Sequence, residues 1–221
     1  MRDSVWGRRM PHVYLKRFVS LCKQHNAKQV IDAGCGSGLY AAYFSLQGFE
    51  VVAMDISRTG LAMTKHLAKS LRFLKLAEAV HAELSNIEII NGELPHFPVA
   101  TNEAQAIFVN YTLHQLTHKE LNACILEFRR ILKDRGILLL HEPCEDELPP
   151  PNRTVEVLED GSWFLKKYGL VNWNLTRDQL SRIISNNFNV LAEERLEENG
   201  KSKIILVLEK STTTPATNFN D

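Results

Sequence analysis

Residues 30–38 read Val-Ile-Asp-Ala-Gly-Cys-Gly-Ser-Gly, and this stretch decides the fold. The apolar residues before the glycines predict a short buried strand over 29–33. Gly34 and Gly36 permit positive φ and close backbone approach, and they leave N–H groups exposed at the start of a helix expected over 39–47. The segment therefore predicts a strand, a ligand-binding turn and a helix in direct succession.

The glycine spacing and the acid ahead of it indicate which kind of ligand this turn binds. The loop reads G-x-G-x-G, with Asp32 two residues before the first glycine. A nicotinamide-binding turn favours G-x-G-x-x-G, and Leu39 breaks that longer spacing. A carboxylate is a poor neighbour for a pyrophosphate but suits an ammonium group. We therefore expect a cofactor that carries an amine and no phosphate.

Helical and strand patterns alternate on both sides of the loop. The expected helices are one that begins after Pro11, 39–47 capped by Gly48, 61–84 as one helix or as two broken near Ser70, one from the capping box Thr117–Glu120 to Gly136, and one from the capping box Thr176–Gln179. The expected strands are 29–33, 51–54, 87–90, 106–110 and 137–140, followed by a hairpin of 190–191 and 204–208 around Asn199-Gly200.

This order of elements predicts one fold class. Strand–helix–strand units imply parallel strands joined by right-handed crossovers. Five such strands and a closing hairpin predict an α/β fold, a doubly wound, seven-stranded mostly parallel sheet with a C-terminal antiparallel hairpin. The final antiparallel strand distinguishes this plan from a plain dinucleotide-binding fold. We expect a single domain over 1–210, with a helical clasp at 1–27, a substrate roof at 143–175 and a flexible tail at 211–221.

The composition is that of an ordinary globular protein. Its 221 residues are 44% hydrophobic and 24% charged, and 26 basic side chains balance 26 acidic ones. Without net charge, no overall field draws the chain to nucleic acid or to an anionic membrane. The four cysteines have no zinc-site spacing, and we find neither a signal-peptide pattern nor an apolar run of about 18 residues. We expect a cytoplasmic protein that acts on a small molecule, with no nucleic acid or membrane partner, and its oligomeric state stays open.

Polar side chains follow three of the expected strands. Asp55 ends the second strand, where a carboxylate can accept hydrogen bonds from both hydroxyls of a ribose. Glu93 follows the third strand and can accept from an adenine amino group. Asn110 ends the fourth strand, above the point where the strand order should reverse and a crevice should open. These positions predict a nucleoside-containing ligand beside the glycine loop.

Together these motifs resemble the class I S-adenosylmethionine-dependent methyltransferase family over about residues 30–140. The shared features are the D-x-G-x-G-x-G loop, the acid after the second strand, and the acid followed by Leu-Pro after the third. The resemblance implies S-adenosylmethionine as the cofactor, with its methionine part against the loop and its ribose on Asp55. The cofactor-binding residues that we expect are Arg9, Asp32, Gly34, Cys35, Gly36, Gly38, Asp55, Ile56, Glu93, Leu94 and Asn110.

A narrower likeness concerns the residues around this core. Arg9 ahead of the loop, with Asn110 and His114 after the fourth strand, resembles glycine N-methyltransferase and related small-molecule enzymes. There an arginine pairs with the cofactor carboxylate, a role that Arg9 or its neighbour Arg8 would match. The large insertion that such an enzyme carries after its fifth strand is absent, so its substrate is not carried over.

Methyl transfer requires mainly that the acceptor be aligned with an already activated methyl group. We expect His114 to contact the cofactor or deprotonate a substrate, although a polar residue that merely begins a loop fits the pattern as well. Tyr111 is the second catalytic candidate, as a wall of the site. His141 and Glu142 end the fifth strand and face the predicted crevice, where they can contact substrate. The acidic run 142–147 reads as a solvated loop, or as an attraction for an amine.

Other methyltransferase classes fit less well. The sequence Asn110-Tyr111-Thr112-Leu113 lacks the N-P-P-Y form of enzymes that methylate DNA bases or glutamine amides. A metal-dependent catechol-type site needs an Asp after the fourth strand and an Asp-Asn pair after the fifth, so we predict no metal. Aromatic residues in the roof segment can enclose an apolar or cationic group, or can simply pack the loop down. They are Trp163, Phe164, Tyr168 and Trp173.

The sequence thus predicts an enzyme that transfers a methyl group from S-adenosylmethionine to a small-molecule acceptor. The alternative is a catalytically silent subunit that binds S-adenosylmethionine and supports a partner. A nicotinamide oxidoreductase, the third hypothesis, conflicts with the glycine spacing and the closing hairpin. The identity of the acceptor, the atom that is methylated and the use of a general base stay open.

Overall fold

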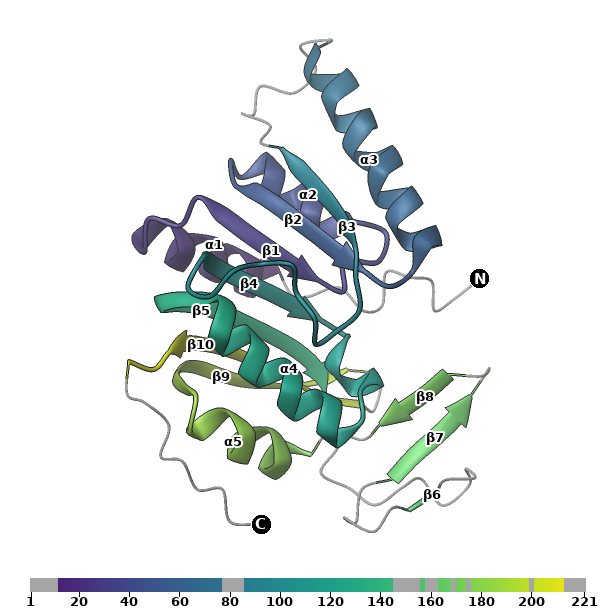
Figure 1. The fold of residues 1–221 in the computed structure, drawn as a ribbon, viewed down its shortest axis with the longest axis vertical. Coiled ribbons are helices and arrows are strands. Elements are labelled where there is room, and N and C mark those ends of the chain that lie inside the picture. Colours follow the sequence, from purple (N-terminus) through teal and green to yellow (C-terminus); the bar gives the residue numbers. More distant parts are fainter. Residues whose placement is uncertain are drawn as a thin grey trace.

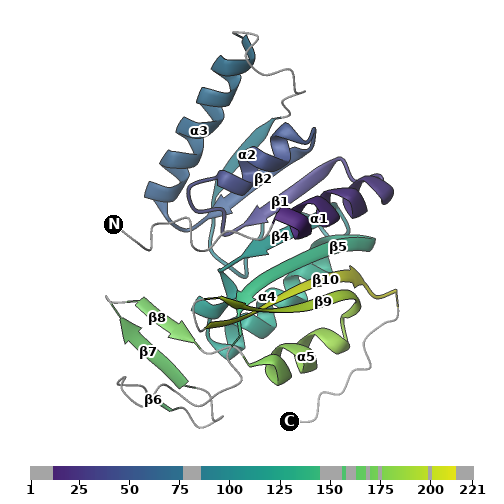
Figure 2. The ribbon, with the colours of Figure 1, turned by 180° about the vertical axis from the view of Figure 1, so that it is seen from behind.

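The computed structural model of the protein describes residues 12–76, 86–144, 156–157, 163–167, 170–173, 176–198 and 201–212. In these residues, helices cover both faces of a seven-stranded sheet, and a smaller sheet lies to one side (Figures 1 and 2). The helices are α1 (His12–Gln24), α2 (Leu39–Leu46), α3 (Arg58–Leu76), the 3-10 helix η2 (Leu113–Gln115), α4 (His118–Ile131) and α5 (Arg177–Ser185). The strands of the large sheet are β1 (Gln29–Ala33), β2 (Glu50–Asp55), β3 (Ile87–Asn91), β4 (Ala104–Asn110), β5 (Leu132–Pro143), β9 (Phe188–Glu198) and β10 (Lys201–Lys210).

The large sheet has the order β3-β2-β1-β4-β5-β10-β9. Its first five strands in chain order pair in parallel, whereas β10 pairs antiparallel with both β5 and β9. The predicted fold class is therefore confirmed. The direction of strand addition reverses between β1 and β4, and a crevice outside the carboxyl ends of the strands is expected there.

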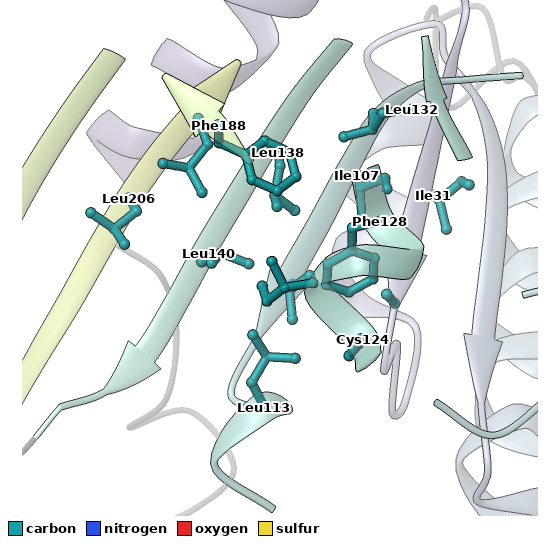
Figure 3. Packing of buried hydrophobic residues seen from close by; sticks show 14 of the residues in the cluster. Ile31, Ile107, Leu113, Cys124, Phe128, Leu132, Leu138, Leu140, Phe188 and Leu206 are labelled. Atoms are coloured by element: carbon teal, nitrogen blue, oxygen red, sulfur yellow. The ribbon is translucent and has the colours of Figure 1, made fainter. Parts of the chain in front are cut away.

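Two apolar layers hold the helices on the sheet because neighbouring residues of a strand face opposite sides. In β4, Ile107 and Val109 join the layer beneath α4 and α5, which Figure 3 shows around Phe128. Phe108 joins the opposite layer beneath α1 and α2, where its ring lies 5.0 Å from that of Phe44. Both layers are fully buried at these positions, so the carboxyl ends of the strands rest on a rigid base.

Local signals placed two helix starts correctly. The Thr117 hydroxyl accepts from the Glu120 amide at 3.2 Å, and the Glu120 carboxylate accepts from the Thr117 amide at 2.7 Å. Thr176 and Gln179 make the same reciprocal pair at the start of α5. Both predicted capping boxes are confirmed.

Two boundaries differ from the prediction. Helix α3 begins at Arg58 and runs unbroken past Ser70, whose hydroxyl donates to the His66 carbonyl, and the predicted stretch 77–84 lies outside the described residues. Gly136 does not end α4, which stops at Ile131, but lies within β5. A Cβ at Gly136 would approach the Lys133 carbonyl oxygen to 2.8 Å, so the glycine serves close backbone approach at an irregular strand start.

The C-terminal hairpin is confirmed and is longer than predicted. The pairing of β9 with β10 runs from Glu198–Lys201 to Phe188–Lys210, and turn residues 199–200 lie outside the described residues. Ser211, which we expected in the tail, is buried and donates its amide to the Asn187 carbonyl at 3.2 Å. The ordered chain therefore extends beyond residue 210.

The predicted roof segment contains strands that the sequence did not reveal. β6 (Glu156–Val157), β7 (Trp163–Lys167) and β8 (Leu170–Trp173) form a separate antiparallel sheet in the order β6-β7-β8. Strand β8 lies next to η2, so this small sheet stands at the same edge of the large sheet as the crevice (Figure 1). No helix among the described residues is long and apolar enough to cross a lipid bilayer.

Candidate cofactor site

A cavity of about 490 Å³ opens at the carboxyl ends of β1, β2 and β4, where the strand order reverses. This volume lies in the range of cofactor and small-molecule sites. Nine of the predicted site residues line it, namely Gly34, Cys35, Gly36, Asp55, Ile56, Glu93, Leu94, Asn110 and Tyr111. The fold thus brings predicted site residues from four separate segments of the sequence to one cavity.

The glycine loop lies close to the segment that follows β4. The amides of Gly34 and Cys35 both donate to the Met54 carbonyl, at 2.8 and 3.0 Å, which fixes the loop against β2. Gly34 has φ +77°, and a Cβ there would come within 2.2 Å of the Thr112 hydroxyl. Only glycine satisfies both conditions, so the first glycine of the motif permits contact between the two walls of the cavity.

Asp55 joins the loop to the start of α3. Its Oδ2 accepts from the Gly36 amide at 2.7 Å, and its Oδ1 accepts from the Ser57 amide at 2.7 Å. A carboxylate offers about four acceptor sites, so both oxygens keep a lone pair for a ligand hydroxyl. Asp55 therefore holds the chain at the start of α3 and lines the cavity at the same time.

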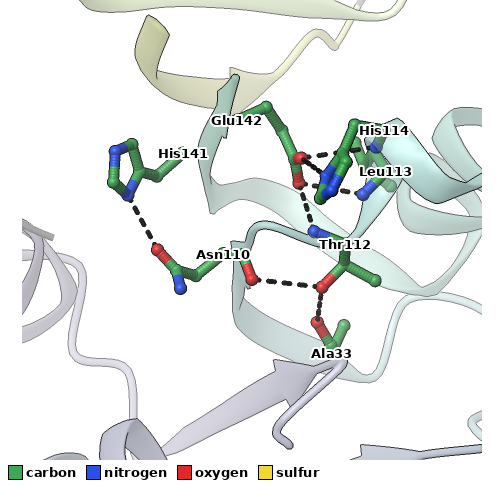
Figure 4. A network of polar contacts seen from close by, with 7 residues as sticks. All are labelled: Ala33, Asn110, Thr112, Leu113, His114, His141 and Glu142. Atoms are coloured by element: carbon green, nitrogen blue, oxygen red, sulfur yellow. Dashed lines mark hydrogen bonds and ion pairs between the residues drawn. The ribbon is translucent and has the colours of Figure 1, made fainter. Parts of the chain in front are cut away.

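The segment after β4 is held from behind by a buried carboxylate (Figure 4). Glu142 is fully buried, and its Oε1 accepts from the Thr112 and Leu113 amides at 2.9 Å each. Its Oε2 lies 3.0 Å from Nδ1 of His114 and also accepts from the His114 amide at 3.4 Å. The prediction of a solvated acidic loop is therefore wrong at Glu142, which holds the cavity wall in place.

The two catalytic candidates have different surroundings. Tyr111 lines the cavity, has φ +55°, and donates its amide to the His141 carbonyl at 2.8 Å. Its ring meets those of His114 and His141 edge to face, at centroid distances of 5.8 and 5.1 Å. His114 is 7% exposed, packs against Glu142 and does not line the cavity. The structure thus puts Tyr111, rather than His114, at the cavity surface.

Two further predicted cofactor residues, Gly38 and Asp32, do not line the cavity. Arg9 lies outside the described residues. Gly38 begins α2 with φ +79°, directly behind the loop. Asp32 is 1% exposed, and its Oδ2 has no hydrogen-bond partner among the described residues. Burial raises the pKa of Asp32 to about 7, a hydrogen bond from the Ala41 amide opposes this, and the charge of Asp55 adds to it.

The raised pKa of Asp32 predicts that the fold loses stability as the pH rises. The group binds its proton more tightly in the folded chain than in the unfolded chain, where its pKa is 3.8. This stabilisation is complete below the unfolded value and is lost as the pH rises through about 7. The free energy of unfolding of Asp32→Asn, measured with urea, should therefore rise relative to that of the natural chain by about 3 kcal/mol from pH 5 to pH 8. A stability difference that does not change with pH would contradict this assignment.

Further lining residues had no signal of their own in the sequence. They are Ser37, Leu39, Tyr40, Met54, Gly92, Thr112, Gln115, Leu116 and Glu120. Glu120 belongs to a capping box, so its place at the start of α4 was predictable, but its place on the cavity wall depends on tertiary packing. Gln115 and Leu116 reach the cavity because η2 turns the chain back after β4.

The charges of the cavity wall fit a cationic ligand. Asp55, Glu93 and Glu120 line it, and none of the described lining residues is Lys or Arg. Such a wall repels a pyrophosphate and attracts a sulfonium or an ammonium group. The buried unpartnered oxygen of Asp32 adds an acceptor behind the loop. The donor and acceptor set therefore fits an adenosyl ligand that carries positive charge.

The chain belongs to the class I S-adenosylmethionine-dependent methyltransferase family, as its fold, its glycine loop and this cavity lead one to expect. The family model described as "Methyltransferase domain" matches residues 31–140, a range that includes the glycine loop and all the residues that line the cavity. S-adenosylmethionine, the cofactor that the resemblance implied, is thereby confirmed.

Relatives of known sequence and structure agree with this assignment. Malonyl-[acyl-carrier protein] O-methyltransferase of Yersinia pestis is 26% identical over 60% of this chain and 43% of its own length. Glycine/sarcosine N-methyltransferase of Parasynechococcus marenigrum is 27% identical over 59% of this chain and 43% of its own length. The chain thus spans less than half of these two relatives. The PH0226 protein of Pyrococcus horikoshii OT3 has the same fold, with a TM-score of 0.67, 21% identity, and 91% and 92% of the two chains covered.

Proposed function

We propose that this chain transfers a methyl group from S-adenosylmethionine to a small-molecule acceptor. The observation that carries the proposal is the cavity at the switch point, which unites the glycine loop, Asp55, Glu93 and Asn110. The names of the relatives lend support, since one methylates a carrier-bound malonyl group and another methylates glycine and sarcosine.

Each wall of the cavity suits one part of the cofactor. The glycine loop would hold the methionine part, with Asp32 behind it and Arg9 as the partner of the carboxylate. Asp55 would accept from the ribose hydroxyls, Ile56 and Leu94 would cover the adenine, and Glu93 would accept from its amino group. When bound, S-adenosylmethionine supplies an activated methyl group on a sulfonium.

The remaining residues have the task of aligning the acceptor. Asn110 ends β4 and Tyr111 follows it at the cavity, and the buried Glu142 fixes the next two residues through their backbone amides. Rigid placement of an acceptor provides most of the rate in such a reaction. The small sheet β6-β7-β8 lies beside η2, which supports a role of segment 143–175 as a roof over the acceptor.

A calorimetric titration tests the proposal. We expect micromolar dissociation constants for S-adenosylmethionine and S-adenosylhomocysteine and no binding of NAD, because three carboxylates line the cavity. A folded protein that binds neither adenosyl compound would overturn the proposed function. Binding without turnover on any acceptor, together with a stable complex in cell extract, would favour the silent-subunit alternative.

A further inference from the structure

One backbone amide of the glycine loop, that of Ser37, has no hydrogen-bond partner among the described residues. The three amides ahead of it donate to the Met54 carbonyl or to the Asp55 carboxylate, and the amide after it donates to the Cys35 carbonyl at 2.9 Å. Ser37 also lines the cavity. The loop therefore retains one backbone donor for a ligand.

The carbonyl of Gly36, in the same peptide unit as the Ser37 amide, is bonded to helix α3. Thr64 is 1% exposed, and its hydroxyl oxygen lies 3.0 Å from the Gly36 carbonyl oxygen and 3.1 Å from that of Gly60. A hydroxyl has only one proton to donate. The Gly60 carbonyl already has the Thr64 amide as its helical partner, whereas the only other contact of the Gly36 carbonyl is the Cys35 thiol, a weak donor 4.0 Å away. The hydroxyl proton therefore goes to Gly36.

Glycines on both the helix and the loop make this contact possible. A Cβ at Gly60 would approach the Gly36 carbonyl oxygen to 2.8 Å, and a Cβ at Gly38 would approach the Cγ2 of Thr64 to 2.6 Å. Gly38, a predicted cofactor residue that does not line the cavity, thus makes room for Thr64. Helix α3 therefore packs its backbone directly onto the loop, and Thr64 lies at the centre of that contact.

The bond to Thr64 decides where the Ser37 amide points. The peptide unit between Gly36 and Ser37 is planar and trans, so its C=O and its N–H point in opposite directions. The C=O is turned toward the buried Thr64 side chain. The N–H is consequently turned away from α3, on a residue that lines the cavity.

We propose, building on the proposed function, that Thr64 is a positioning residue for S-adenosylmethionine. Its hydroxyl holds the peptide between Gly36 and Ser37 so that the Ser37 amide donates to the carboxylate of the methionine part. The carboxylate is the group of that part that accepts hydrogen bonds, because the ammonium and the sulfonium both carry positive charge. Thr64 itself does not touch the cofactor and acts through the loop backbone.

The charges of the cavity make this donor important. Asp55, Glu93 and Glu120 line it, and none of the described lining residues is Lys or Arg. These carboxylates favour the positive groups of the cofactor but repel its carboxylate. A backbone N–H that donates to an ionised oxygen forms a charge-assisted hydrogen bond, about twice as strong as a neutral one. An amide held in the right direction therefore offsets part of this repulsion.

Calorimetry with two ligands tests the role of Thr64. Thr64→Val keeps the shape of the side chain and removes its hydroxyl, so the dissociation constants of S-adenosylmethionine and S-adenosylhomocysteine should rise about 10-fold. The ligand 5′-methylthioadenosine has the adenine, ribose and sulfur but no carboxylate, and its affinity should stay unchanged. Thr64→Ser restores the hydroxyl and should bind all three ligands as the natural chain does. Thr59→Val, on the exposed side of α3, is the matched control and should have no effect.

Amide NMR of the natural chain tests the direction of the Ser37 N–H without any variant. S-adenosylhomocysteine should move the Ser37 amide proton downfield, as expected for a new bond to a carboxylate. With 5′-methylthioadenosine this signal should stay close to its position in the free protein. In the free Thr64→Val variant the Ser37 signal should already be displaced, because the peptide has lost its anchor. A Ser37 signal that responds equally to both ligands would overturn the inference.

The remaining outcomes separate this inference from the proposed function. If Thr64→Val weakens both classes of ligand equally, the hydroxyl serves only the general stability of the loop and the inference is wrong. Unchanged affinity of Thr64→Val for S-adenosylmethionine would overturn it as well, and in both cases the proposed function stands. Failure of the natural chain to bind S-adenosylmethionine would instead overturn the proposed function.

Discussion

Asp55→Ala is expected to weaken S-adenosylmethionine binding by about 100-fold or more while leaving the sheet folded. The variant removes the acceptor of the Gly36 amide and, under the proposed function, that of the ribose hydroxyls. Hydrogen bonds to a charged group contribute about 1.5–3 kcal/mol each, so the loss of two accounts for this factor. Calorimetry measures the affinity, and circular dichroism checks the fold.

A matched pair of variants separates the two roles of Asp55. Asp55→Asn keeps one acceptor oxygen and should bind with intermediate affinity. Glu50→Ala removes an exposed carboxylate at the opposite end of β2 and should bind like the natural chain. If Asp55→Ala binds S-adenosylmethionine with unchanged affinity, its ribose assignment is wrong.

Glu142→Ala should produce the largest loss of stability, about 3–5 kcal/mol. The fully buried carboxylate accepts from three backbone amides and contacts the His114 ring. Its removal leaves these donors buried without an acceptor, and each unpaired donor then lowers the free energy of unfolding by its full desolvation penalty. Urea unfolding measures the effect as a lower free energy of unfolding.

Two further variants test the cause of this loss. Glu142→Gln keeps one carbonyl oxygen for the amides and should lose about half as much stability. Glu197→Ala, on the exposed part of β9, should stay within about 0.5 kcal/mol of the natural chain. A Glu142→Ala variant as stable as Glu197→Ala would show that the segment after β4 does not depend on this carboxylate.

The features that could be predicted from the sequence are those that depend on residues close together in the chain. The glycine loop with its acid, the two capping boxes and the alternating strand patterns each depend on a few consecutive positions. They were sufficient for the fold class and for most of one cavity wall. Gly136 shows the limit of such signals, because a glycine after a helical pattern suits a helix end and a close backbone approach equally well.

The features that the sequence did not predict depend on distant partners. Glu142 reads as the first residue of an acidic run, and its burial follows only from the pairing of β5 with β4 and the turn of η2. The small sheet of β6, β7 and β8 has short strands without a clear alternation of apolar and polar residues, so no local pattern predicted it. His141 could be placed at a strand end, but its unpartnered nitrogen is a property of packing.

The position of β10 has a consequence for how the protein is made. This strand is the last in the chain, among the described residues, yet it lies between β5 and β9 in the sheet. While the ribosome is still translating, the edge of β5 stays open until about residue 210 has left the exit tunnel. An open, apolar strand edge is a site for chaperones and for aggregation. The β5 edge is therefore expected to stay exposed in the nascent chain for longer than in a fold whose last strand is added at the rim of the sheet.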